Sequence, residues 1–274
     1  MMKRVFALML AVLTLCALVA CSGEDDGVTG DPVIDVEIQL STYTDSNGDT
    51  FTYEYLNSTS VTITGFSGSD EPHLVTIPAY IVEEVKGPGN EVEKVEKKVT
   101  AIADRAFRAN SNISNIKCEA ELESIGSYAF TYCEALVTVE LPDSLVSIGD
   151  GAFYNCSALT TVDLGTGVKE IGNHVFANCA VLTGVTFPAS LQSIGEYAFA
   201  ECVALTAVEL SEGLVSVGTQ AFYNCTAVEK LTLPATLTEI GKWAFNPFVR
   251  TLPDEAVTVV EGSKAAEHVA QFRP

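Results

Sequence analysis

A nine-residue phrase that recurs every 23 residues constrains the fold of this chain more than any other feature. The phrase reads I-G-x-x-A-F-x-x-C. Its five clear copies begin at Ile125, Ile148, Ile171, Ile194 and Val217. A degenerate copy begins at Ile102, and a last copy begins at Ile240. Because no insertion or deletion interrupts this register, the segment must be treated as one repeat array.

Each copy continues with apolar residues in the pattern L-x-x-V-x-L, as at Leu159, Val162 and Leu164. The last two apolar residues alternate with a polar one, which is the period of a strand with one buried face. In alternate copies a proline follows the strand, and proline has no N–H to continue a ladder. These prolines are Pro142, Pro188 and Pro234.

The A-F-x-x-C segment is too short for a proper helix and is expected to form a single turn or a 3₁₀ piece. One such unit cannot bury its own apolar face, whereas stacked units bury a continuous core with strands about 4.8 Å apart. We therefore predict a β-rich solenoid with short helical turns. One short strand per repeat contributes to a parallel sheet, and both ends of the array are capped.

The repeat resembles the BspA-like class of bacterial leucine-rich repeats, which share the phrase L-x-x-[IV]-x-[LF]-P followed by I-G-x-x-A-F-x-x-C. The resemblance covers residues 99–250 and implies a leucine-rich repeat solenoid. Its departures are few and concentrate in the outer copies, as expected for caps. They are Ala103, Asn110, Val175 and Phe248.

Residues 1–20 combine a short basic start with an apolar run that ends in small residues, which is typical of a secretory signal peptide. The run is short for a membrane-spanning helix. Its end, Leu18-Val19-Ala20-Cys21, resembles the lipobox of bacterial lipoproteins. That resemblance implies cleavage before Cys21, lipidation of Cys21 and stable membrane anchoring by several acyl chains. Residues 21–36 form an acidic tether, and Glu24-Asp25-Asp26 resembles a signal for display on the outer membrane surface.

The segments before and after the array are expected to cap it. Residues 37–98 are expected to form an N-terminal β cap, with a hairpin turn at SNGD, a half-repeat at 74–80 and a charged hairpin or loop as an insert. Residues 251–274 are expected to form a strand and then a short helix with Ser263 as its N-cap.

The excess of acidic over basic residues argues against nucleic acid as a partner. The chain has 36 acidic and 15 basic residues and a formal net charge of −21 at pH 7. Such a surface repels nucleic acid, and no basic cluster offsets it locally. We expect neither nucleic-acid binding nor a cofactor.

The repeat cysteines raise the question of a metal or catalytic site. We predict a ladder of buried free thiols that fill space in the core. Disulfides between neighbouring copies are the alternative, but parallel side chains do not present converging Cβ atoms. A zinc site would need ligands from several copies to turn toward one point. The row consists of Cys133, Cys156, Cys179, Cys202 and Cys225.

Two groups of outward-facing residues are candidates for ligand contact. The first is acidic and lies on the strand positions of the repeats. It comprises Glu140, Asp163 and Glu209. The second is aromatic and lies in the return segments, where it offers large contact area at low entropy cost or merely shields the edge of the stack. It comprises Tyr128, Tyr154, His174, Tyr197, Tyr223 and Trp243.

We interpret the chain as a lipid-anchored surface protein of the bacterial outer membrane that is not an enzyme. The family resemblance implies adhesion to a host or bacterial protein or to a glycan, outside the cell. One alternative is an accessory lipoprotein of a glycan uptake system. Another is a glycan-active enzyme with a site built from loops, because pairs of carboxylates are expected by abundance alone.

Overall fold

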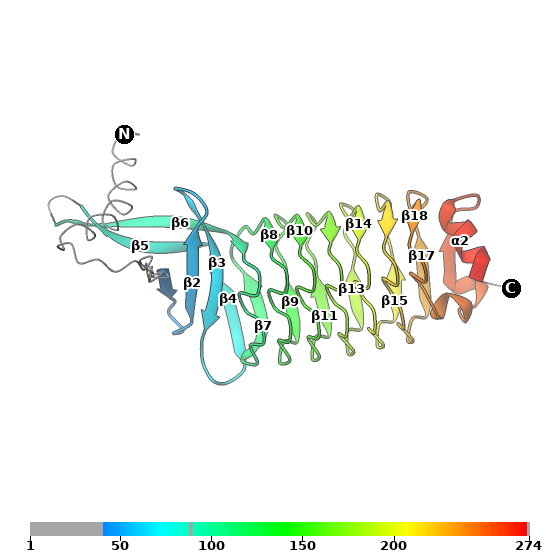
Figure 1. Cartoon of the computed structure of the whole chain (residues 1–274), viewed down its shortest axis with the longest axis horizontal. Helices are drawn as coiled ribbons and strands as arrows, with labels where there is room; N and C mark the ends of the chain where they lie inside the picture. Colours follow the sequence, from blue (N-terminus) through cyan, green and yellow to red (C-terminus); the bar gives the residue numbers. More distant parts are fainter. Residues whose placement is uncertain (1–40, 88–89, 273–274) are drawn as a thin grey trace, which may run out of the picture. The chain divides into compact units, whose positions relative to one another are not determined.

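The computed structural model describes residues 41–87 and 90–272. The predicted signal peptide, Cys21 and the acidic tether lie outside these described residues. From residue 41 onward the chain forms one compact unit, which begins with antiparallel strands and continues as stacked coils (Figure 1).

The N-terminal segment is an antiparallel meander. Strands β1 (Ser41–Thr44), β2 (Thr50–Tyr55) and β3 (Ser60–Ser67) pair in sequence order. The hairpin predicted at SNGD is confirmed, because Thr44 pairs with Thr50 across it. The Asp45 carboxylate accepts the backbone N–H groups of Asn47 and Asp49 and so forms an Asx turn.

Three further strands connect this meander to the repeats. Strand β4 (His73–Ile77) pairs in parallel with β7 (Ile113–Cys118), as expected for a half-repeat. The charged insert is an antiparallel hairpin of β5 (Tyr80–Lys86) and β6 (Val92–Ile102). The C-terminal part of β6 also pairs with β3 and with the first two-residue strand of the array.

Each full repeat contributes the expected short strand to a parallel ladder, which we call the main ladder. Val139 pairs with Val162 and Val162 with Val185, a shift of one repeat each time. The ladder divides into two sheets between β13 and β15, next to Phe187, which replaces the leucine of the neighbouring copies. Its repeat strands are β9 (Thr138–Glu140), β11 (Thr161–Asp163), β13 (Gly184–Thr186), β15 (Ala207–Glu209) and β17 (Lys230–Leu233).

A second ladder, which the sequence pattern did not reveal, runs along the residue pair that ends in isoleucine or valine. Its apolar residue points inward, and the preceding serine or glutamate faces outward. The glycine that follows lies close to the preceding coil: a Cβ on Gly172 would come within 2.6 Å of Asp150 Oδ1 and 2.9 Å of Asp150 N. The strands are β8 (Ser124–Ile125), β10 (Ser147–Ile148), β12 (Glu170–Ile171), β14 (Ser193–Ile194), β16 (Ser216–Val217) and β18 (Glu239–Ile240).

The A-F-x-x-C segments are hydrogen-bonded turns, the first of the two conformations expected for them. Of the described 3₁₀ helices, η1 (Phe248–Arg250) begins at the last residue of the final copy and η2 (Asp254–Ala256) follows it. Strand β19 (Val257–Val259) then pairs with β17, and α2 (Lys264–Phe272) ends the described chain. Ser263 caps α2 as predicted, because its Oγ accepts the Ala266 N–H at 3.1 Å.

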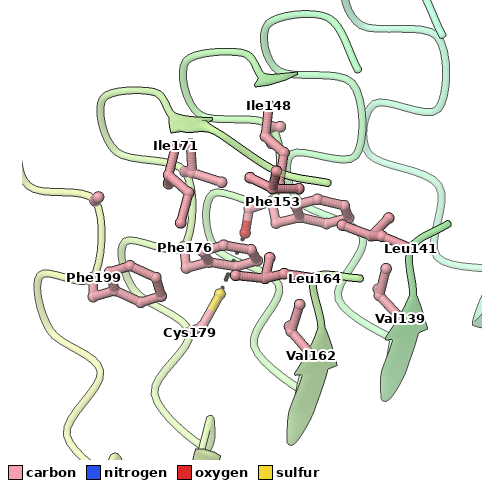
Figure 2. Packing of buried hydrophobic residues seen from close by; sticks show 14 of the residues in the cluster. Val139, Leu141, Ile148, Phe153, Val162, Leu164, Ile171, Phe176, Cys179 and Phe199 are labelled. Atoms are coloured by element: carbon pink, nitrogen blue, oxygen red, sulfur yellow. Dashed lines mark hydrogen bonds between the residues drawn. The ribbon is translucent and has the colours of Figure 1, made fainter. Parts of the chain in front are cut away.

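Phenylalanine rings stack through the centre of the coils. Between Phe107 and Phe245 successive ring centroids are 4.7 to 5.6 Å apart, as each coil places its ring over the preceding one. Figure 2 shows Phe153, Phe176 and Phe199 in this stack, with Ile148 and Ile171 on one side and strand residues such as Val162 on the other. The core is therefore a set of continuous rows, one for each apolar position of the repeat.

In the described part of the chain, no helix has the length and apolar character needed to cross a membrane.

Candidate binding surfaces

The repeat cysteines are structural. All five are free and fully buried, as predicted. Each thiol donates to the phenylalanine carbonyl of the preceding coil, and Figure 2 shows this bond between Cys179 and Phe153, at 3.3 Å. Burial raises the pKa of Cys133, Cys179 and Cys225 to about 12. These thiols therefore stay protonated at neutral pH and are poor nucleophiles.

His174 is not a partner of Cys179, although the two lie five positions apart. Cys179 is fully buried, whereas His174 is exposed and stacks on Tyr197 with ring centroids 4.9 Å apart. Position 174 belongs to a row of equivalent positions on the outside of the coils, which we call the outer row. The outer row consists of Arg105, Tyr128, Gly151, His174, Tyr197, Gln220 and Trp243.

Every residue of the outer row has a left-handed backbone conformation, with φ between 53° and 61°. This conformation is costly for residues other than glycine, asparagine and aspartate, so the surrounding coil must impose it. It is needed because the chain turns sharply there between the second ladder and the buried A-F pair. The turn directs the outer-row side chains away from the core.

Within the outer row the rings contact their neighbours through their faces. The His174 and Tyr197 rings are 4° from parallel, and the Tyr197 hydroxyl donates to Gln220 Oε1 at 2.6 Å. The Tyr128 ring covers Gly151, where an added Cβ would lie 2.5 Å from a ring carbon. Lys242 lies over Trp243, 4.3 Å from the ring centroid. Contacts with neighbouring residues therefore cover part of each of these rings.

Tyr132 is an exposed aromatic residue that the sequence reading missed. It is 40% exposed and packs edge-on against Tyr154, with centroids 5.7 Å apart. Its position just before the cysteine also has positive φ, at 60°, and three other copies place asparagine there. That preference for asparagine, which tolerates the left-handed conformation, was a signal that the position lies on an outward turn. Tyr223, the equivalent of Tyr154, is half-buried.

The acidic candidates Glu140, Asp163 and Glu209 are exposed on the main ladder. Glu140 and Asp163 are neighbours in adjacent strands, whereas Glu209 is paired with Lys230. Asp163 also accepts the Gly165 N–H at 3.0 Å. These acidic residues lie on the main ladder. The aromatic residues lie in the turns that follow the strands of the second ladder, so the two predicted groups lie on separate segments of the coils.

The surface offers shallow depressions. One, of about 460 Å³, lies beyond the main ladder beside Asp143, Asp163 and Ser190. Another, of about 420 Å³, runs along the second ladder beside residues such as Ser147, Gly172 and Ser193. The N–H of Thr166 lowers the pKa of Asp143, which is the response of an ordinary exposed carboxylate. Among residues 41–87 and 90–272, no three His, Cys, Asp or Glu side chains gather to hold a metal ion.

The repeat geometry and the buried Phe and Cys rows agree with a known family. The sequence model of the BspA type leucine rich repeat region matches in six copies, over residues 91–202 and 169–250. The chain belongs to this family. The match covers the main ladder, the second ladder and the outer row.

The fold recurs in a solved structure of a bacterial protein. A leucine rich cell surface protein from Faecalibacterium prausnitzii is 29% identical, with a TM-score of 0.62 over 75% of this chain. This chain spans only 52% of that protein. A leucine rich repeat protein of T. pallidum is 24% identical, with a TM-score of 0.49, over 81% of this chain and 92% of its own length. A search of curated proteins finds no match.

Proposed function

We propose that this protein is a lipid-anchored adhesion or recognition module on the bacterial cell surface, without catalytic activity. The observation that carries the proposal is the distribution of side chains in the coils. Apolar residues, phenylalanines and thiols are committed to the core, and the variable residues face outward on a rigid repeating backbone. Repeat proteins use such extended surfaces to bind ligands.

Three further observations support the proposal. The family match places the chain among BspA type repeats, and the similar F. prausnitzii structure is named a cell surface protein. The lipobox-like ending at Cys21 supports anchoring of the mature protein at a membrane. The open depressions, with acidic residues on the main ladder and aromatic residues in the turns, support surface recognition over a reaction in an enclosed site.

Anchoring can be tested separately from binding. Cys21→Ala should shift the protein from the membrane fraction to the soluble fraction, because the acylated thiol is removed. Cys16→Ala is the matched control, since Cys16 lies within the predicted signal peptide. Protease treatment of intact cells should remove the repeats if they are displayed outside. Membrane retention of Cys21→Ala would contradict the lipid anchor, and full protease protection would contradict surface display.

Recognition can be tested with arrays of matrix proteins, bacterial surface proteins and glycans, using the full chain in mild detergent. We expect saturable binding to a small set of ligands, without turnover of any of them. Release of a cleaved product from a bound ligand would contradict the non-catalytic assignment.

A further inference from the structure

Two arginines of the first coil lack an acidic partner, although the chain carries 36 acidic and only 15 basic residues. Arg105 and Arg108 are exposed and share one turn, in which the Arg108 N–H donates to the Arg105 carbonyl at 3.1 Å. Across the described residues, ion pairs with carboxylates use lysines and His73, and none uses an arginine. This turn therefore presents two guanidinium groups without a carboxylate partner in an acidic protein.

Tyr128 lies beside Arg105 on the next coil, and Tyr132 and Tyr154 contact each other on the next two coils. The Arg105 guanidinium is 5.8 Å from the centroid of the Tyr128 ring, and Tyr132 packs edge-on against Tyr154. In this described region the hydroxyls of the three tyrosines make no hydrogen bond, unlike that of Tyr197. We call this surface the Arg–Tyr patch. It consists of Arg105, Arg108, Tyr128, Tyr132 and Tyr154.

The backbone under the patch is fixed. Arg105, Tyr128 and Tyr132 all have left-handed conformations, with φ between 58° and 60°. The neighbouring carboxylates of Asp104 and Asp150 accept backbone N–H groups of the following coils, at 2.6 and 2.7 Å. Neither acid is paired with a patch arginine. The side chains are therefore attached to pre-ordered positions, which reduces the entropy lost on binding.

We propose that the Arg–Tyr patch binds a short acidic polypeptide segment of a partner protein. This inference rests on the proposed recognition function and names the ligand class for one part of the surface. Guanidinium groups form paired hydrogen bonds with carboxylates, and tyrosine and arginine dominate the energetics of protein interfaces. Free tyrosine hydroxyls add hydrogen bonds to the partner backbone or side chains.

A protein partner fits this surface better than an anionic glycan. Arg105 lies over the Tyr128 ring and Gly151 lies against the same ring, so that ring is poorly placed to stack on a sugar. Neither of the two depressions described above includes a patch residue. A long polyanion that reached the patch would also cross the acidic faces of the coils, which repel it. A short acidic segment avoids that repulsion.

The repeats themselves supply substitutions that preserve the fold. Arg105→Gln places the residue of the equivalent position 220, and Arg108→Ala that of position 177. Tyr132→Asn copies position 155, and Tyr154→Ala copies position 200. Each new residue therefore already occurs in the same backbone conformation. A variant with all four substitutions should melt like the parent protein, and Arg250→Gln with Tyr223→Ala is a control pair near the other end of the array.

A phage-displayed library of random peptides, selected on the full chain in mild detergent, tests the ligand class. We expect selected peptides to be rich in Asp and Glu, to bind the fourfold variant about tenfold or more weakly, and to bind the control pair unchanged. Added salt should weaken the interaction. Selected peptides without acidic enrichment, or equal binding by the fourfold variant, would overturn the proposal.

Immobilised hyaluronan and heparin form the second arm of the experiment. Binding of either glycan through the patch, without acidic peptides being selected, would replace the peptide ligand with an anionic glycan and overturn the proposal. Ligands that bind elsewhere on the coils would support the recognition function and overturn only the proposal for the Arg–Tyr patch. If the chain bound nothing in either arm or in the arrays, both the recognition function and the proposal for the Arg–Tyr patch would be overturned.

Discussion

At the scale of single residues, the position of a side chain in the repeat decides what it can do. Phe176, Cys179 and His174 belong to one nine-residue phrase, yet two of them are fully buried and the third is exposed. The Cys179 thiol donates to the Phe153 carbonyl, which also accepts the Cys156 N–H at 3.3 Å, so the thiol fills space in the core and its own polar group has a partner.

The burial of the thiols predicts their reactivity. With the pKa raised to about 12 for Cys133, Cys179 and Cys225, iodoacetamide should leave the five repeat thiols unmodified in the native protein near pH 8. After denaturation, peptide mass spectrometry should find all five alkylated. Disulfide-linked repeat peptides, or rapid alkylation of the native protein, would contradict the buried ladder.

Truncation of one stacked ring should be costly. Phe176→Ala removes a fully buried side chain between Phe153 and Phe199 and should lower the free energy of unfolding by about 3–5 kcal/mol. His174→Gln, two positions away in the exposed outer row, should change it by less than about 0.5 kcal/mol. Chemical denaturation measures both. Equal stability of the two variants would mean that the ring stack contributes little.

At the scale of elements, the second ladder depends on glycine. Gly172→Ala would bring a Cβ within 3 Å of the Asp150 backbone and side chain, so we expect a loss of about 1–3 kcal/mol of stability. Gly184 lies in β13 with no atom within 4 Å of an added Cβ, and the next repeat has Ala207 there. Gly184→Ala should therefore be neutral or stabilise by about 0.5–1 kcal/mol. The reverse order of the two melting temperatures would contradict this account.

The sequence predicted the main ladder well because a fixed period sets the register directly. Val139, Val162 and Val185 align in the sequence and pair in the structure. The second ladder was not predicted, since a two-residue strand such as Ser147–Ile148 is too short to show an alternating pattern. The hairpins and the helix cap at Ser263 were predicted from local turn and capping residues.

The candidate binding surfaces were predicted only in part, because the contacts between their side chains cannot be read from the repeat pattern. Sequence alignment shows that a position varies and therefore tends to be exposed, but it does not show contacts between variable side chains. The stack of His174 on Tyr197 and the cover of Tyr128 over Gly151 both depend on the left-handed turn. Whether these residues bind a ligand stays a prediction.

At the scale of the whole molecule, each coil contacts mainly its neighbours. The first and last coils lack one neighbour, so each end needs its own cap to shield the core from solvent. At the N-terminal end, His73 joins β4 to the hairpin that contains Asp49. At the C-terminal end, α2 places His268 between Phe245 and Phe272. The two histidines have opposite environments, so the ends of the molecule should respond to pH in opposite directions.

His73 should stabilise the N-terminal end most strongly while it is protonated, because only the imidazolium can donate to both acceptors. Its Nδ1 lies 3.0 Å from the Glu71 carbonyl and its Nε2 lies 2.9 Å from the buried Asp49 carboxylate. Neither oxygen can donate, so both contacts require an N–H. These two acceptors, the Glu71 carbonyl first, raise the pKa of His73 above its usual value of 6.5. The stabilisation is therefore complete below pH 6.5 and is lost as pH rises through the folded-state pKa.

Thermal melts from about pH 5 to about pH 8 of the full chain and His73→Gln measure this effect. The parent protein should exceed His73→Gln in melting temperature at the acidic end, and the difference should shrink as pH rises. A difference that is constant with pH would show that His73 acts by packing alone.

His268 should have the opposite effect at the C-terminal end. Burial lowers its pKa, and its Nε2 is buried without a hydrogen-bond partner. The neutral ring is therefore the form that packs between the phenylalanines. The contribution of His268 to stability is therefore complete above pH 6.5 and is lost as pH falls from there through the lowered folded-state pKa. In the same melts His268→Phe, which keeps the aromatic contacts, should resist this acid loss. If its melting temperature fell with the parent's below pH 6.5, carboxylates elsewhere would be the cause. If only the His268→Phe profile stayed flat, the loss of stability in mild acid would be assigned to protonation of the buried His268 ring.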